Sequence, residues 1–150
     1  MQRKRKISIH SAPHRRGVAT TLTLLDEMLC KVEEWAKGRE ARSVLYQECN
    51  TLSPRQKSAM LSQVTETKAL LRQISDDLGL RPEERSVASE IWAMASALRE
   101  HVMELEGRYM RRYGDVPTQL ADYLDARSAE LLGGMDRLME ILSGKFSPDD

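Results

Sequence analysis

The chain has 150 residues, of which 31% are charged and 5% are aromatic, and its formal net charge is zero. A chain of this length forms one domain that buries a core without needing disulfides or a metal ion. It contains neither the ~20 consecutive apolar residues of a membrane span nor the apolar core of a signal peptide. We therefore expect a soluble, cytoplasmic protein.

The N-terminal segment is the most unevenly charged part of the chain. Residues 1–16 hold six basic residues and no acidic one. We predict a flexible basic arm at residues 1–13, a helical bundle domain at 14–144 and a flexible tail at 145–150. The arm would attract nucleic acid or an anionic membrane surface through counterion release.

The first predicted helix begins between Pro13 and Gly17 and runs toward Asn50. Its apolar residues alternate at three- and four-residue spacing, which places them on one face of a helix. They are Val18, Leu22, Leu25, Leu29, Val32 and Ala36. Glycine costs a helix interior about 1 kcal/mol relative to alanine, and apolar residues beyond Gly38 are sparser. We expect a kink or fraying there.

The second predicted helix has the clearest boundaries in the sequence. Ser53, Pro54 and Gln56 form a capping-box pattern, and Gly79 follows Leu78 as a left-handed stop. Its apolar stripe contains Met60, Val64, Thr67, Leu71, Ile74 and Leu78.

The third predicted helix opens with Pro82-Glu83-Glu84 and runs to Tyr113. Its stripe contains Val87, Ile91, Met94, Leu98, Val102 and Leu105. The short link between the second and third helices favours an antiparallel hairpin, which we expect to be rigid.

The fourth predicted helix starts at Asp115-Val116-Pro117 and ends near Ser143. Gly133-Gly134 interrupts it and predicts a bend. Its stripe contains Leu120, Leu124, Leu131, Leu138 and Ile141. Together the four segments predict an all-α fold, an elongated antiparallel bundle of about four long helices with a disordered basic N-terminal arm.

Catalytic, cofactor and metal motifs are absent from the sequence. A ferritin-like di-iron site needs Glu-x-x-His on two helices, but Leu98 stands three residues before His101, the one histidine inside a predicted helix. A phosphorelay histidine is also disfavoured, because acidic Glu104 replaces the lysine expected nearby. Cys30 and Cys49 would lie ~28 Å apart on a continuous helix, too far for a disulfide. We expect two free thiols, no cofactor and no enzymatic activity.

A basic cluster offers a further nucleic-acid hypothesis. Arg108, Arg111 and Arg112 stand beside Tyr109 and Tyr113, and arginine with tyrosine can stack on bases. Cations at a helix C-terminus are also favoured by the helix dipole alone. We therefore expect nucleic-acid binding less than protein binding.

One segment resembles a known family. The run from Leu61 to Leu71 (Leu-Ser-Gln-Val-Thr-Glu-Thr-Lys-Ala-Leu-Leu) is similar to the central helix of FlgN-type flagellar export chaperones. An acid and Lys68 follow the first apolar turn there, and Leu70-Leu71 come next. The helix order is similar over about residues 20–144, while Arg111-Arg112-Tyr113-Gly114-Asp115 departs from the asparagines that the family often shows ahead of its last helix.

The resemblance implies a bacterial chaperone that binds helical segments of late flagellar subunits and delivers them for type III export. The binding mode would be helix-in-groove. The residues we expect to contact a client lie on the last helix, where methionine adapts to different partners. They are Leu120, Leu124, Leu131, Met135, Leu138, Met139 and Leu142.

Two alternatives to a client-binding chaperone follow from the same residues. A homo-oligomeric coiled-coil structural or adaptor protein would bury the stripes against a second copy of itself. A nucleic-acid- or membrane-associated module would instead use the basic arm. Gly38 and Gly133-Gly134 weaken the first and last helices, so we expect any exposed stripe on the last helix or on the far half of the first.

Overall fold

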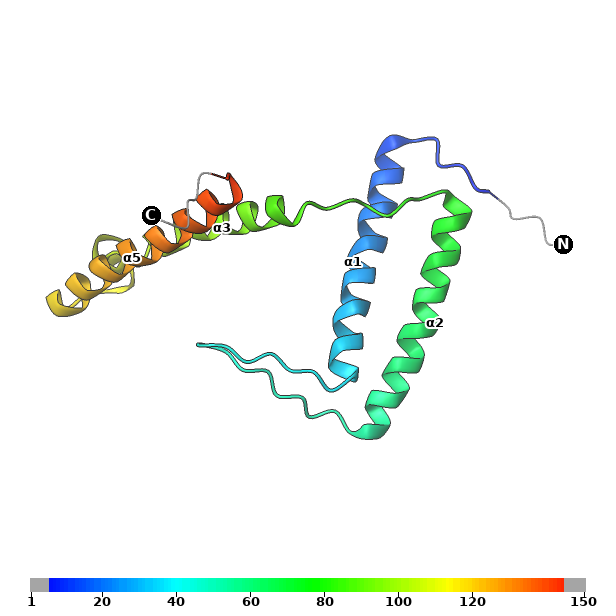
Figure 1. The fold of residues 1–150 in the computed structure, drawn as a ribbon, viewed down its shortest axis with the longest axis horizontal. Helices are drawn as coiled ribbons and strands as arrows, with labels where there is room; N and C mark the ends of the chain where they lie inside the picture. The colour runs from blue at the N-terminus through cyan, green and yellow to red at the C-terminus, as the bar shows by residue number, and fades with distance from the viewer. Residues whose placement is uncertain (1–5, 145–150) are drawn as a thin grey trace. The chain divides into compact units, whose positions relative to one another are not determined.

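The computed structural model describes residues 6–144, and regular structure there is helical (Figure 1). This confirms the all-α class. The main helices are α1 (Ala12–Ala36), α2 (Pro54–Leu78), α3 (Val87–Met103) and α5 (Thr118–Leu142). A short helix α4 (Gly107–Met110) and a 3-10 turn (Arg111–Tyr113) connect α3 to α5.

The chain divides into two compact units, Met1–Pro82 and Glu83–Asp150, called unit 1 and unit 2 below. Unit 1 pairs α1 with α2, and unit 2 pairs α3 and α4 with α5. Each long helix therefore finds its main packing partner within its own unit.

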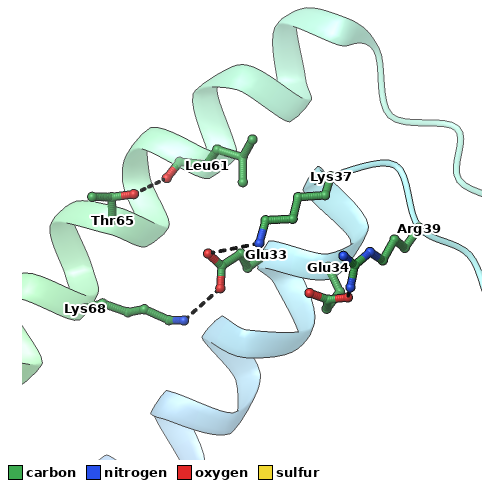
Figure 2. Close-up of polar contacts among 7 residues, drawn as sticks. All are labelled: Glu33, Glu34, Lys37, Arg39, Leu61, Thr65 and Lys68. Atoms are coloured by element: carbon green, nitrogen blue, oxygen red, sulfur yellow. Dashed lines mark hydrogen bonds and ion pairs between the residues drawn. The ribbon is translucent and has the colours of Figure 1, made fainter.

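The α1–α2 pair of unit 1 uses the apolar stripes that the sequence predicts. Leu29, Ala36 and Val64 are buried where the two helices meet. Glu33 lies between two lysines, accepting a 2.9 Å hydrogen bond from Lys68 Nζ on α2 and pairing with Lys37 Nζ at 3.6 Å (Figure 2). These contacts run between helices of opposite direction, and they make unit 1 a helical hairpin.

At the open end of this hairpin, residues at and just before the start of α1 contact the end of α2. The backbone N–H of Ile7 donates to the carbonyl of Asp77 at 2.9 Å, and the Arg15 guanidinium donates to the carbonyl of Gly79 at 2.9 Å. The second half of the predicted arm is therefore bonded to the end of α2. Residues 1–5 of the arm and the predicted tail at 145–150 lie outside the described residues.

The prediction that the first helix continues toward Asn50 is wrong. The helix ends at Ala36, and Gly38 has φ +85°, a left-handed conformation that stops an α-helix. The following segment folds back on the helix end, where the Asn50 side chain donates to the carbonyl of Trp35 at 2.7 Å. Val44 and Leu45 stand at the tip of this segment and are 93% and 95% exposed.

Helix boundaries elsewhere follow local capping chemistry. The capping box at Ser53 and Gln56 and the left-handed Gly79 (φ +64°) are both present. The third helix starts at Val87 rather than at Pro82, because the Ser86 side chain accepts from the backbone N–H of Ser89 and caps it. The interruption predicted at Gly133-Gly134 is wrong, since both glycines lie inside the uninterrupted α5.

The third helix also ends earlier than predicted, at Met103 rather than Tyr113. The chain turns at Glu104–Glu106 and places Gly107 against α5. The Gly107 backbone N–H donates to Asp125 Oδ1 at 2.8 Å. A side chain at Gly107 would meet the Ala121 Cβ at 2.7 Å, so this contact requires glycine.

Candidate helix-binding surface

The α3–α5 pair of unit 2 is held by one forked ion pair and a row of small residues. Arg99 Nε and Nη2 donate to the two carboxylate oxygens of Asp136 at 3.0 and 3.3 Å. Arg99 also holds the pKa of the Asp136 carboxyl below its usual value, chiefly through this hydrogen bond. Arg99 thus lies opposite Asp136, whereas Gly107, which follows α3, lies opposite Asp125, earlier in α5. Because the contacts move backward along α5 as the chain advances from α3, the two helices are antiparallel.

The buried side chains between these helices are small. Ala95 of α3 and Ser128 of α5 are buried, as is Gly107. Small residues let two helix backbones approach closely and leave little room for leucine between them. The larger apolar side chains of both helices are therefore displaced toward the edges of the contact.

The seven residues predicted to bind a partner fall into two groups on α5. Four of them are half-buried, on the side of α5 that contains Ser128 and packs on α3. These are Leu124, Met135, Met139 and Leu142. The other three, Leu120, Leu131 and Leu138, are exposed.

The exposed residues of α5 form a second stripe beside the packed one. Leu131 and Leu138 are separated by seven residues, and Ile141 continues the row; all three are about half exposed. A separation of seven residues brings side chains back to nearly the same side of a helix. This stripe lies about a quarter turn around the helix axis from Ser128 and its neighbours.

Helix α3 carries a matching exposed stripe. The prediction that Met94 and Leu98 belong to the packed seam of this helix is wrong, since both are exposed while Ala95 is buried. On α3, as on α5, the exposed stripe is rotated from the packed stripe in the same sense. For antiparallel helices this rotation places both stripes on one side of the pair. Arg99–Asp136 sets a register that brings Met94 and Leu98 level with Leu138 and Ile141.

We call this surface the apolar face of unit 2. It consists of Met94, Leu98, Leu131, Leu138 and Ile141. The apolar pattern of the sequence predicts the α5 half of this face but not its α3 half. The signal that could have revealed the α3 half was the row of small residues at Ala95, Gly107 and Ala121, which marks the closest helix contact.

Charged residues border the apolar face on α5. Arg127 Nη1 pairs with Glu130 Oε2 at 2.7 Å, and this hydrogen bond raises the pKa of the guanidinium above its usual value. Arg137 lies seven residues after Glu130, on the same side of the helix, and forms no ion pair with any residue in 6–144. The border thus carries one acidic and one basic position a heptad apart.

The other sequence candidates already have partners within the chain. Arg108 and Arg112 pair with Glu106 at 2.8 Å and Glu104 at 2.9 Å, so two of the clustered arginines are neutralised locally. Nucleic-acid binding by this cluster or by the arm stays a prediction. His101 is exposed, and its ring Nδ1 lies 3.2 Å from the carbonyl oxygen of Ala97.

The two cysteines, Cys30 and Cys49, are free and exposed, as the sequence predicts. Within the described part of the chain, no three histidine, cysteine, aspartate or glutamate side chains gather to hold a metal ion. None of the helices in residues 6–144 combines the length and apolar character that a membrane crossing requires. Comparisons with protein-family models, curated proteins and solved structures found no match.

Proposed function

We propose that this protein is a non-enzymatic binding protein that takes an amphipathic helix of a partner protein on the apolar face of unit 2. The observation that supports this is the exposed stripe of Leu131, Leu138 and Ile141 on α5, with Met94 and Leu98 beside it on α3. Two parallel rows of apolar side chains on neighbouring helices match the anchor spacing of helix-in-groove recognition.

The energy available at this face fits a weak interaction. Complete burial of a leucine or methionine side chain contributes about 1.5–3 kcal/mol, and the five side chains have roughly half of that still to gain. A partner helix would therefore gain about 4–7 kcal/mol before the cost of association, which is of similar size. Additional polar contacts at the border would be needed for tight binding.

Within this function, we propose the more specific role of a flagellar-type export chaperone. The segment that resembles that family, Leu61–Leu71, lies in α2 and pairs it with α1, through buried Val64 and the Lys68–Glu33 ion pair. It would therefore maintain the scaffold, and the client would bind elsewhere, on α5. The prediction that the four long helices form one elongated bundle also stays a proposal. The contacts described are those within each unit, and each unit pairs only two of the four.

Photo-crosslinking in the native host tests this function. A photoreactive amino acid at Leu131 or Leu138 should form crosslinks to a helical segment of another protein whose apolar residues follow three- and four-residue spacing. The matched control is Ala129, which is exposed on the opposite side of α5. Equal crosslinking from Ala129 and Leu131, or none from Leu131, would refute the proposal. A late flagellar subunit as the crosslinked protein would support the chaperone role specifically.

A further inference from the structure

The apolar face of unit 2 has the size, spacing and border charges to bind a copy of itself. Residues at alternating spacing on α5 form a continuous seam of the kind that packs helices in antiparallel pairs. The seam begins at Leu124, which is half-buried at the edge of the α3 contact, and continues through Arg127, Leu131, Gly134, Leu138 and Ile141. Its central position is occupied by glycine.

Neither Gly133 nor Gly134 has a packing role within the chain, since an added Cβ would have open space at both; Gly134 differs in lying on the seam, between Leu131 and Leu138. Glycine inside a helix costs about 1 kcal/mol relative to alanine, and a Cβ added to Gly134 would meet no atom within 4 Å. Gly107, in contrast, is explained by its contact with Ala121. A glycine at the middle of an exposed apolar seam lets a second helix approach closely, so the cost of Gly134 would be recovered on association.

The charged residues at the border of the apolar face favour a second copy of this chain as its partner. If α5 packs antiparallel to α5 of a second copy, with Leu131 opposite Gly134, then Leu138 lies opposite Arg127 and Ile141 opposite Leu124. In this arrangement Glu130, which pairs with Arg127 in its own helix, also comes beside Arg137 of the second copy, and the two-fold axis repeats the contact. Flanking positions of this kind pair with each other across antiparallel helices. The Glu130 carboxylate then lies between two guanidinium groups, one from each copy.

The area of the face sets an upper limit on the dimer contact. The helix lengths of α3 and α5 and a helix width of about 10 Å give the face at most roughly 600 Å² per copy. Two fully covered faces would just reach the ~1,200 Å² at which specific stable interfaces begin, so a contact through α5 mainly would be a weak one. One isolated partner helix would cover less of the surface.

We propose that the free protein forms a two-fold dimer through the apolar face of unit 2, with α5 antiparallel to α5 across Gly134. The dimer covers the surface assigned above to a partner helix. It rests on the proposed function only in using that same surface, and a partner helix would have to displace the second copy.

Sedimentation velocity on the full chain, between about 1 and about 100 μM, tests the dimer in the range where micromolar affinities are resolved. The wild type should shift from monomer to dimer as concentration rises. Glu130→Arg and Arg137→Glu should each weaken dimerisation by about tenfold or more, because like charges then face each other twice. The double variant Glu130→Arg/Arg137→Glu should restore the dimer.

A matched glycine pair tests the position of the contact. Gly134→Arg and Gly133→Arg make the same change at adjacent, exposed positions of one helix, and an added Cβ has open space at both. Circular dichroism should show that both variants remain helical. Gly134→Arg should be monomeric, and Gly133→Arg should dimerise like the wild type.

Several results would overturn the dimer. They are a monomeric wild type at every concentration, equal behaviour of the two glycine variants, or a double charge variant that dimerises no better than the singles. Failure of the dimer and failure of the proposed function are separable. A monomer whose Leu131 probe still crosslinks to a partner helix refutes the dimer alone, whereas a dimer whose probe crosslinks only to its second copy refutes the proposed function alone.

Discussion

Replacing Gly107 with alanine should destabilise unit 2, because its Cα faces the backbone of α5. The new Cβ would lie 2.7 Å from the Ala121 Cβ and 3.2 Å from the Ala121 Cα. Carbon atoms in contact prefer about 3.5–4.0 Å, so one helix would have to move away by most of an ångström. The hydrogen bond from the Gly107 N–H to Asp125 would lengthen with that movement.

The magnitude follows from two opposing effects. Overpacking of this kind costs about 1–3 kcal/mol, while a Gly→Ala change in a helix gains at most about 1 kcal/mol. The gain is smaller here because Gly107 is the first residue of α4. We expect a net loss of about 1–2 kcal/mol in the free energy of unfolding. For a unit of this size that lowers the melting temperature by roughly 4–8 °C per kcal/mol.

The assay can report on unit 2 alone, because each unit contains one tryptophan, Trp35 in α1 and Trp92 in α3. In a Trp35→Phe background, thermal unfolding is followed by Trp92 fluorescence at one fixed protein concentration. Gly133→Ala is the matched control: an added Cβ has open space there, so it should raise the melting temperature. A Gly107→Ala variant that melts at or above the parent temperature would refute the close contact.

Three further predictions concern unit 1. The hydrogen bond from Lys68 Nζ, and after it the charge of Lys37, lower the pKa of Glu33. Ionised Glu33 therefore stabilises unit 1 fully above its ordinary carboxylate pKa, and this stabilisation is lost as pH falls through the lowered pKa. Urea midpoints measured down to pH ~3 should fall less steeply for Glu33→Gln than for wild type. Leu29→Ala should cost about 2–5 kcal/mol in urea unfolding, since Leu29 is 5% exposed, whereas Leu24→Ala at a 60% exposed site should stay within about 0.5 kcal/mol. Ser53→Ala removes the capping box of α2 and should lower unfolding free energy by about 1 kcal/mol, and an unchanged value would contradict the cap.

The sequence by itself determined the helical class and most of the helix ends. Periodic apolar residues require a helical face, and side chains such as Ser53 satisfy nearby backbone groups whatever lies elsewhere in the chain. Gly79 acts in the same local way, through its left-handed conformation. Boundaries set by such local chemistry can be read without knowledge of distant contacts.

The tertiary structure decided which side of each helix is packed and which is exposed. A stripe such as that of α3 contains enough apolar residues for two faces, and only the close approach at Ala95, Gly107 and Ala121 shows which one meets α5. That choice leaves Met94 and Leu98 beside Leu138 and Ile141, which lie far along the chain on a different helix. Packing between helices depends on complementary shapes of both partners, and a periodic pattern along one helix carries no information about its partner.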